Sequence, residues 1–165
     1  MPINAQKNCW IDYMSYDLRK IVYRSWYLPM LKPKKQYLSA YYYIAIKLNI
    51  PVELVIAHAH IESNQNHLAL GQLNEYGLWQ FLPSTWKQIM DNADWKDINN
   101  QIKAYIKHAS YLIQKFKLNL YEPEDQKIFL WCWNAGEGNY QKKILPVITK
   151  KYIEKFMTLY PQVEV

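Results

Sequence analysis

The sequence contains little cysteine, and this scarcity excludes two kinds of small protein. Cys9 and Cys132 are its two cysteines, too far apart for either a disulfide framework or a Cys-rich zinc motif. Cys132 lies among apolar residues, which predicts a buried thiol. We therefore expect a packed core to hold the fold, with no metal and no cofactor.

Arginine is also scarce, although the chain is basic. Lys and Arg together number 20 against 14 Asp and Glu, which gives a formal net charge of +6, yet Arg19 and Arg24 are the only arginines. A basic chain favours a polyanionic partner such as nucleic acid, an anionic membrane or bacterial cell wall. Because base recognition and bidentate phosphate binding favour Arg over Lys, we expect no nucleic-acid partner.

Long apolar runs are missing as well. The first twenty residues carry Asp12 and Asp17 among aromatic residues and form no apolar stretch, so the sequence predicts no signal peptide. Further along the chain the apolar stretches are too short or too interrupted for a membrane span.

Apolar and aromatic residues are abundant and follow a helical period. The sequence has 15 Tyr, 7 Trp and 4 Phe, and 50% of its residues are hydrophobic. From Pro51 to Glu62, apolar side chains recur at three- and four-residue steps, whereas strand-like alternation is found nowhere. The sequence predicts an all-α fold with an irregular patch around 65–76 and helices at 10–28, 36–48, 51–62, 83–90, 98–117, 123–135 and 146–160.

Glycine is confined to two short segments. Gly71 and Gly77 lie in one, Gly136 and Gly138 in the other. In a helical chain this poor in glycine, such clustering marks tight turns or close approach of the backbone to a ligand. The first cluster follows Glu62, which ends the apolar run LVIAHAHI. Burial penalises the charged form of a carboxyl group, and a general acid has to hold a proton.

Four segments around these residues resemble one known family in the same order. They read IAIKLNIPVELVIAHAHIES at 44–63, ESNQNHLALGQLNEYGLWQFLPSTW at 62–86, WNAGEGN at 133–139 and LPVITKKYIEKF at 145–156. The resemblance is to the soluble lytic transglycosylase (SLT) domain, with its Glu-Ser pair, GLMQ-type segment, YNAG segment and closing Pro-x-x-Thr-x-x-Tyr helix. It implies an all-α, lysozyme-like domain of the goose-type and SLT kind with an active-site cleft. We expect that domain over residues 36–165, preceded by an aromatic and basic helical extension at 1–35.

The resemblance also implies an activity and a site. Glu62 would act as sole acid and base, cleaving the β-1,4 bond from N-acetylmuramic acid to N-acetylglucosamine in peptidoglycan and leaving a 1,6-anhydro sugar. Ser63 would orient Glu62, and Tyr152 would close the cleft wall. The remaining expected substrate-binding residues are Trp79, Gln80, Phe81, Trp133, Asn134, Ala135 and Gly136. Trp79, Phe81, Trp86 and Trp133 also fit a plain core cluster, so the sugar-stacking member stays open.

Two alternatives remain. Glu75 precedes the GLWQ segment and as a second carboxylate would position water, making the protein a hydrolysing muramidase. The second alternative is a wall-binding or assembly protein without activity. It is suggested by Trp133, because the family usually has Tyr at this position and an indole N–H cannot pass on a proton. His58, His60 and Glu62 do not form a metal motif, since His60 points away from the face the other two share.

The wall lies outside the cytoplasmic membrane, so the expected place of action is the periplasm or the extracellular face. A wall-cutting domain with no signal peptide suggests a phage protein, carried in the virion or released through a membrane pore at lysis. Residues 1–35 would then dock the domain onto a virion or a secretion assembly.

Overall fold

A computed structural model describes residues 30–165, and the helix expected at 10–28 lies outside this part of the chain. The described residues form helices and no strands, as the sequence predicted. The helices are α2 (Leu38–Leu48), α3 (Val52–Ser63), α4 (Pro83–Met90), α5 (Ile98–Phe116), α6 (Pro123–Ala135), α7 (Glu137–Gln141) and α8 (Val147–Leu159). Two short 3₁₀ helices, η2 (Lys35–Tyr37) and η3 (Tyr160–Gln162), flank them. The sequence did not predict the five-residue α7.

Proline and asparagine set many of the helix ends. Pro83 and Pro123 open α4 and α6, because the fixed φ of proline suits the first turn, where its missing N–H is not needed. Asn49 and Asn64 follow α2 and α3 in the left-handed conformation, with φ of 52° and 53°. Asparagine tolerates this conformation best after glycine, so a chain with few glycines can still end its helices sharply.

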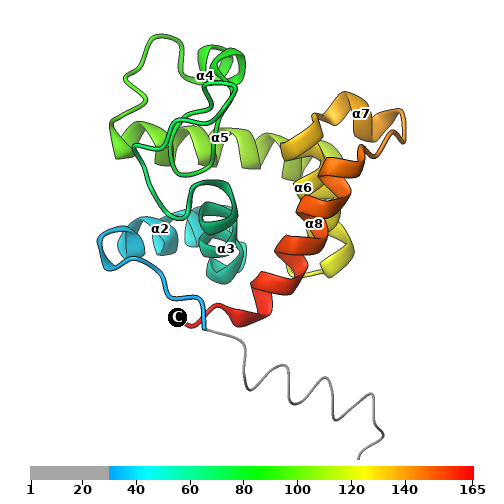
Figure 1. The fold of residues 1–165 in the computed structure, drawn as a ribbon, viewed down its shortest axis with the longest axis horizontal. Helices are drawn as coiled ribbons and strands as arrows, with labels where there is room; N and C mark the ends of the chain where they lie inside the picture. Colours follow the sequence, from blue (N-terminus) through cyan, green and yellow to red (C-terminus); the bar gives the residue numbers. More distant parts are fainter. Residues whose placement is uncertain (1–29) are drawn as a thin grey trace, which may run out of the picture. The chain divides into compact units, whose positions relative to one another are not determined.

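Helix α3 is the centre of the fold (Figure 1). It packs against α2 and α8, while α5 contacts α2, α4 and α6. Six consecutive α3 residues, from Leu54 to Ala59, are 0% exposed. The sequence predicted one buried face, but neighbours surround the helix. Glu62, in its last turn, is therefore carried on the most buried element of the domain.

The chain between α3 and α4 is irregular, as expected, and a buried glutamine holds it. Gln101 of α5 is 0% exposed. Its Oε1 accepts the Leu78 N–H at 2.9 Å, and its Nε2 donates to the carbonyls of His67 and Trp95 at 2.7 and 2.6 Å. Gly77 has φ of +73° and lies so close that a Cβ there would overlap the Gln101 side chain. This contact fixes the GLWQ segment relative to α5.

Residues 31–35 are bonded to the rest of the described chain. The Leu31 N–H donates to the Gln162 carbonyl at 2.7 Å, and the Leu31 carbonyl accepts from the Glu164 N–H at 2.9 Å. The buried Gln65 side chain donates to the Lys32 carbonyl at 3.0 Å and accepts from the Lys34 N–H at 2.8 Å. Here, Gln65 and the C-terminal residues hold the segment in place. The separate extension expected at 1–35 stays a prediction.

Candidate active site

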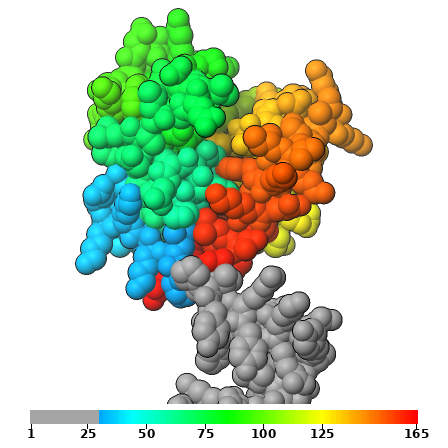
Figure 2. All heavy atoms as spheres, in the orientation of Figure 1, coloured from blue at the N-terminus to red at the C-terminus, as the bar shows by residue number. Residues whose placement is uncertain are grey.

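Glu62 lines a small cavity at the C-terminal end of α3. The cavity has a volume of about 150 Å³ and takes its walls from α3, the 64–82 segment, α4, α5 and α6. In the space-filling view the surface is notched between the green residues of α4 and α5 and the orange residues around α7 and α8 (Figure 2). The residues lining the cavity are Glu62, Leu73, Glu75, Gln80, Phe81, Leu82, Thr85, His108, Trp133 and Asn134.

The Glu62 carboxyl group is held by a residue from the far end of the chain. The Tyr152 hydroxyl of α8 donates a hydrogen bond of 2.5 Å to Glu62 Oε1. The Glu62 side chain is 13% exposed, so it reaches solvent while most of it is covered. Burial and the adjacent Glu62 charge raise the pKa of Tyr152 well above its usual value. Tyr152 therefore keeps its proton and acts as a donor to the carboxylate.

A second side chain, His58, approaches the same oxygen from the core. It lies one helical turn before Glu62, is 0% exposed, and places Nε2 at 3.4 Å from Glu62 Oε1. Its Nδ1 lies 3.1 Å from the Tyr105 hydroxyl of α5. Among the described residues Nε2 has no hydrogen-bond partner, because the contact with Glu62 has the distance of an ion pair and lacks hydrogen-bond geometry. The shared helical face was visible in the sequence, but the partner on α5 was not.

Trp133 is the aromatic residue that joins the core to the cavity. Its ring lies 4.7 Å from the His58 ring and 4.8 Å from the His108 ring, centroid to centroid. Its Nε1 donates to the Trp79 carbonyl at 3.3 Å. Trp79 is 0% exposed and packs in the core. Trp133 is the tryptophan that lines the cavity.

The other aromatic residues expected near sugar are less accessible. Phe81 lines the cavity but is only 3% exposed, and Trp86 is also 3% exposed. Their rings lie 5.8 Å apart in a tilted, edge-on arrangement typical of a core pair. Of the four aromatic residues named from the sequence, Trp79 and Trp86 therefore lie in the core, whereas Phe81 and Trp133 line the cavity.

Ser63 and Asn134 are bonded to backbone and core groups. The Ser63 hydroxyl donates to the Leu78 carbonyl at 2.9 Å, which ties the end of α3 to the GLWQ segment and not to the Glu62 carboxyl group. Asn134 Oδ1 accepts a 2.7 Å bond from the buried Thr149 hydroxyl of α8. This bond leaves the Asn134 amide N–H₂ free to face the cavity that Asn134 lines.

Ala135 and Gly136 end α6 beside this asparagine. The Ala135 carbonyl accepts from the Asn139 side-chain amide at 2.6 Å. Gly136 has φ of +82°, with nothing within 4 Å of the position a Cβ would take. The glycine is required here by its backbone conformation, while the space beside it is open.

Glu75 and Gln80 lie on the opposite wall, in the 64–82 segment. Glu75 Oε2 accepts the Leu73 N–H at 2.8 Å, and Gln80 Nε2 donates to the Gly77 carbonyl at 2.8 Å. Both side chains crowd Gly71, where a Cβ would overlap them. The terminal polar atoms of both side chains therefore brace the loop, and both residues also line the cavity with Glu62.

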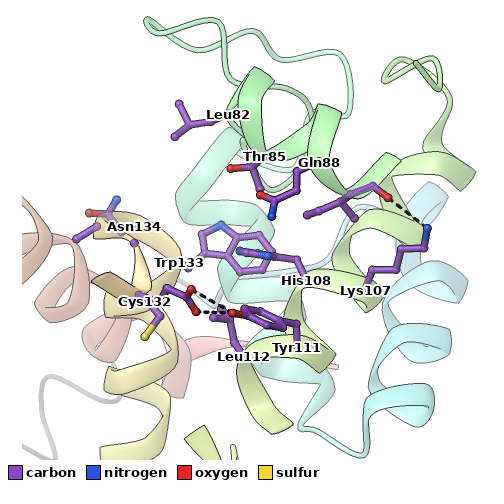
Figure 3. A pocket seen from close by; sticks show the side chains of 14 residues that line it. Leu82, Thr85, Gln88, Lys107, His108, Tyr111, Leu112, Cys132, Trp133 and Asn134 are labelled. Atoms are coloured by element: carbon purple, nitrogen blue, oxygen red, sulfur yellow. Dashed lines mark hydrogen bonds between the residues drawn. The ribbon is translucent and has the colours of Figure 1, made fainter. Parts of the chain in front are cut away.

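A larger cavity of about 510 Å³ continues from the first (Figure 3). The two share Leu82, Thr85, His108, Trp133 and Asn134. Figure 3 shows Trp133 and His108 side by side, with Thr85 and Gln88 above them. The further lining residues are Gln88, Ile89, Lys107, Tyr111, Leu112, Cys132, Ala135, Gly136 and Glu137. Together the cavities form a cleft of mixed apolar and polar character, suited to sugar rings with hydroxyl and acetamido groups.

Two titratable groups of this cleft, Glu137 and His108, have shifted pKa values. Glu137 accepts from Lys115 Nζ and from the Tyr111 hydroxyl, each at 2.9 Å, and these hydrogen bonds lower the pKa of Glu137. Burial lowers the pKa of His108 to about 4, with Glu137 opposing the shift and His58 adding to it. At neutral pH His108 is therefore an uncharged hydrogen-bonding group in the wall that the two cavities share.

The all-α fold and the carboxyl group in a cleft are those of a lysozyme-like domain, and the family match supports this class. The family model of the Transglycosylase SLT domain matches residues 41–156, more than two thirds of the chain. The protein is a member of this family, which confirms the resemblance found in the sequence. The family consists of lytic transglycosylases acting on peptidoglycan, so bacterial cell wall is the substrate class. No curated protein matches the chain. No helix in residues 30–165 is long and apolar enough to cross a membrane.

Proposed function

We propose that this protein cleaves peptidoglycan strands between N-acetylmuramic acid and N-acetylglucosamine, with Glu62 as its sole catalytic acid and base. The observation that carries the proposal is the setting of Glu62. One carboxyl oxygen accepts from the Tyr152 hydroxyl, and the mostly buried side chain borders a cavity at the junction of five structural segments. A general acid has to be held within reach of the leaving oxygen and shielded from bulk water.

The reaction requires one proton to be given and one to be recovered. Protonated Glu62 gives its proton to the glycosidic oxygen, and the bond to C1 of the muramic acid breaks as positive charge develops on the sugar. The substrate's own N-acetyl group stabilises that charge in place of a second carboxylate. The Glu62 carboxylate then takes the proton of the 6-hydroxyl as its oxygen bonds to C1. The product is a 1,6-anhydro sugar, no water is consumed, and Glu62 ends protonated.

The rest of the cleft would bind the strand on both sides of the bond. The Trp133 ring offers an apolar surface, and the free amide group of Asn134 can donate to an acetamido carbonyl. Gln80 would bind from the opposite wall. The open space at Gly136 admits a sugar substituent that a side chain there would obstruct. The Glu137–Lys115 ion pair and the neutral His108 suit an uncharged glycan backbone.

Mass spectrometry of the products tests the proposal. Purified peptidoglycan is digested with the wild type, with Glu62→Gln, and with Glu154→Gln as a control for an exposed glutamate on α8. We expect 1,6-anhydro-muramic acid ends from the wild type and the control, and none from Glu62→Gln. Full activity of Glu62→Gln would overturn the assignment. Wall binding without release of fragments by any of the three would favour the non-enzymatic alternative.

One observation favours hydrolysis as a second candidate, since Glu75 lines the same cavity as Glu62. A carboxylate across the cavity from the acid is where an inverting glycosidase activates water. Against this, one Glu75 oxygen already accepts the Leu73 N–H. Reducing ends, one water heavier than anhydro ends, would establish the muramidase, and Glu75→Gln would abolish them. The lytic transglycosylase predicts anhydro ends from Glu75→Gln as well.

A further inference from the structure

The buried His58 has a polar atom that the folded chain leaves without a partner. Nε2 lies 3.4 Å from Glu62 Oε1, and the residue is 0% exposed. An unpaired buried polar nitrogen costs folding free energy. Leucine or phenylalanine would fill the same space without this cost, so packing alone does not account for a histidine here. The nitrogen faces the carboxyl group that the cleft presents to substrate.

The surroundings of His58 indicate which of its nitrogens carries the proton. Aromatic rings of Phe129, Trp133 and Phe156 enclose it, with no charged group among them. The Tyr105 hydroxyl lies 3.1 Å from Nδ1. Burial, together with the nearby Glu62 charge, raises the pKa of Tyr105 well above its usual value, so the hydroxyl keeps its proton. Tyr105 can then donate to Nδ1, and in neutral imidazole the proton resides on Nε2.

The titratable groups around His58 come from three helices. Glu62 lies on α3, Tyr105 and His108 on α5, and Tyr152 on α8, where it contacts Glu62. Tyr152 and His58 both approach Oε1. The described residues give Oε2 no hydrogen bond. Oε1 is therefore bonded to Tyr152 and approached by His58, while Oε2 is available to substrate.

We propose that His58, oriented by Tyr105, is a positioning residue for Glu62: its Nε2 lies beside Oε1 and donates a hydrogen bond to it when negative charge develops on the Glu62 carboxylate. The proposal rests on the proposed function and deepens it. In this structure Nε2 lies 3.4 Å from Oε1 and forms no hydrogen bond to it. Once the proton has gone to the glycosidic oxygen, the negative charge draws the N–H in. Oε2 then performs both proton transfers, and Oε1 stays held by Tyr152 and His58.

Variants of three residues separate this role from simple packing. His58→Phe keeps an aromatic ring in the core and removes both nitrogens, whereas His58→Gln keeps an N–H near the same place. Tyr105→Phe removes the donor that fixes the tautomer. His60→Phe, two residues away on the same helix, is the matched control, because within residues 30–165 the half-buried His60 forms no hydrogen bond or ion pair with the site. Each is compared by circular dichroism and thermal unfolding before kinetics, so that unfolded variants are recognised.

The expected kinetic result is a loss confined to turnover. For His58→Phe we expect kcat to fall about 10- to 100-fold with KM nearly unchanged, because a hydrogen bond formed with the carboxylate is lost. The pH–rate profile should move to higher pH, since the charged form of Glu62 loses a donor. His58→Gln should recover part of the rate, and His60→Phe should match the wild type. Equal rates and profiles for a folded His58→Phe would overturn the proposal.

Nitrogen NMR tests the tautomer directly and does not depend on activity. In protein labelled with ¹⁵N-histidine we expect His58 to be the Nε2–H tautomer, and Tyr105→Phe to perturb it. An Nδ1–H tautomer in the wild type would overturn the proposed donor. The outcomes also distinguish the positioning role of His58 from the catalytic role of Glu62. If Glu62→Gln is inactive and His58→Phe is normal, only the positioning role fails; if Glu62→Gln is fully active, the proposed function fails first.

Discussion

Tyr152 and Glu62 are 90 positions apart in the sequence, yet the phenol hydroxyl lies 2.5 Å from the carboxyl oxygen. The contact joins α8 to the end of α3, and these two helices pack against each other. In the proposed reaction the Glu62 carboxyl group gives and recovers a proton and needs a fixed orientation. The phenol would supply that orientation without competing as an acid, because its own pKa is raised.

Tyr152→Phe removes this donor and leaves the ring in place. We expect kcat on peptidoglycan to fall about 10- to 100-fold, since a hydrogen bond to a charged group contributes about 1.5–3 kcal/mol. Tyr43→Phe, at a residue 51% exposed on α2, is the matched control and should retain full rate. Release of soluble muropeptides over time measures both. Wild-type turnover by Tyr152→Phe would show that the bond has no part in catalysis.

Gly77→Ala should destabilise the domain, whereas Gly138→Ala should not. Gly77 combines φ of +73° with a position where Cβ would overlap Gln101, so the variant either strains the backbone or displaces a buried hydrogen-bonded side chain. We expect a loss of about 2 kcal/mol or more for Gly77→Ala. Gly138 lies in α7 with nothing within 4 Å of a Cβ, and alanine suits a helix better than glycine. Urea unfolding of both variants measures the difference.

The pH dependence of stability should reflect His108. Its folded-state pKa is lowered from 6.5 to about 4, so the unfolded chain binds the extra proton first as the pH falls. Above pH 6.5 His108 does not lower the free energy of unfolding. Between pH 6.5 and pH 4 this free energy should fall by about 1–3 kcal/mol, because the unfolded chain binds the proton more tightly. His108→Gln should flatten the slope of unfolding free energy against pH in this window. An unchanged slope would mean that groups other than His108 cause the pH dependence of the unfolding free energy.

Cys132 should react slowly with thiol reagents in the native state. It is 3% exposed, and burial raises the pKa of its thiol to about 11. Because the thiolate is the reactive form, little of it exists at pH 8. In a Cys9→Ser variant, we expect labelling at least about 100-fold slower than for a model thiol, with rapid labelling after unfolding in guanidinium. Fast native labelling would mean that the cavity beside Cys132 opens to solvent.

Local sequence determined the helices and the position of Glu62 in the last turn of α3. Proline at the start of α4 and α6 and apolar residues at three- and four-residue steps act within a few residues, so their structural consequences can be predicted from the chain alone. The order of the four motifs likewise indicated the family, and the family model confirms it. Glu62 could be named because it ends an apolar helix and begins a recognisable motif.

Tertiary structure alone decided what surrounds Glu62 and which aromatic residues reach the cleft. Trp79 and Trp133 both belong to motifs of the family, but only packing places Trp79 in the core and Trp133 in the cavity wall. His58 was visible on the face of Glu62, yet its bond to Tyr105 of α5 depends on how two helices meet. Such contacts join residues tens of positions apart. Local periodicity specifies which way a side chain points along its own helix, and only the folded chain determines which partner it meets.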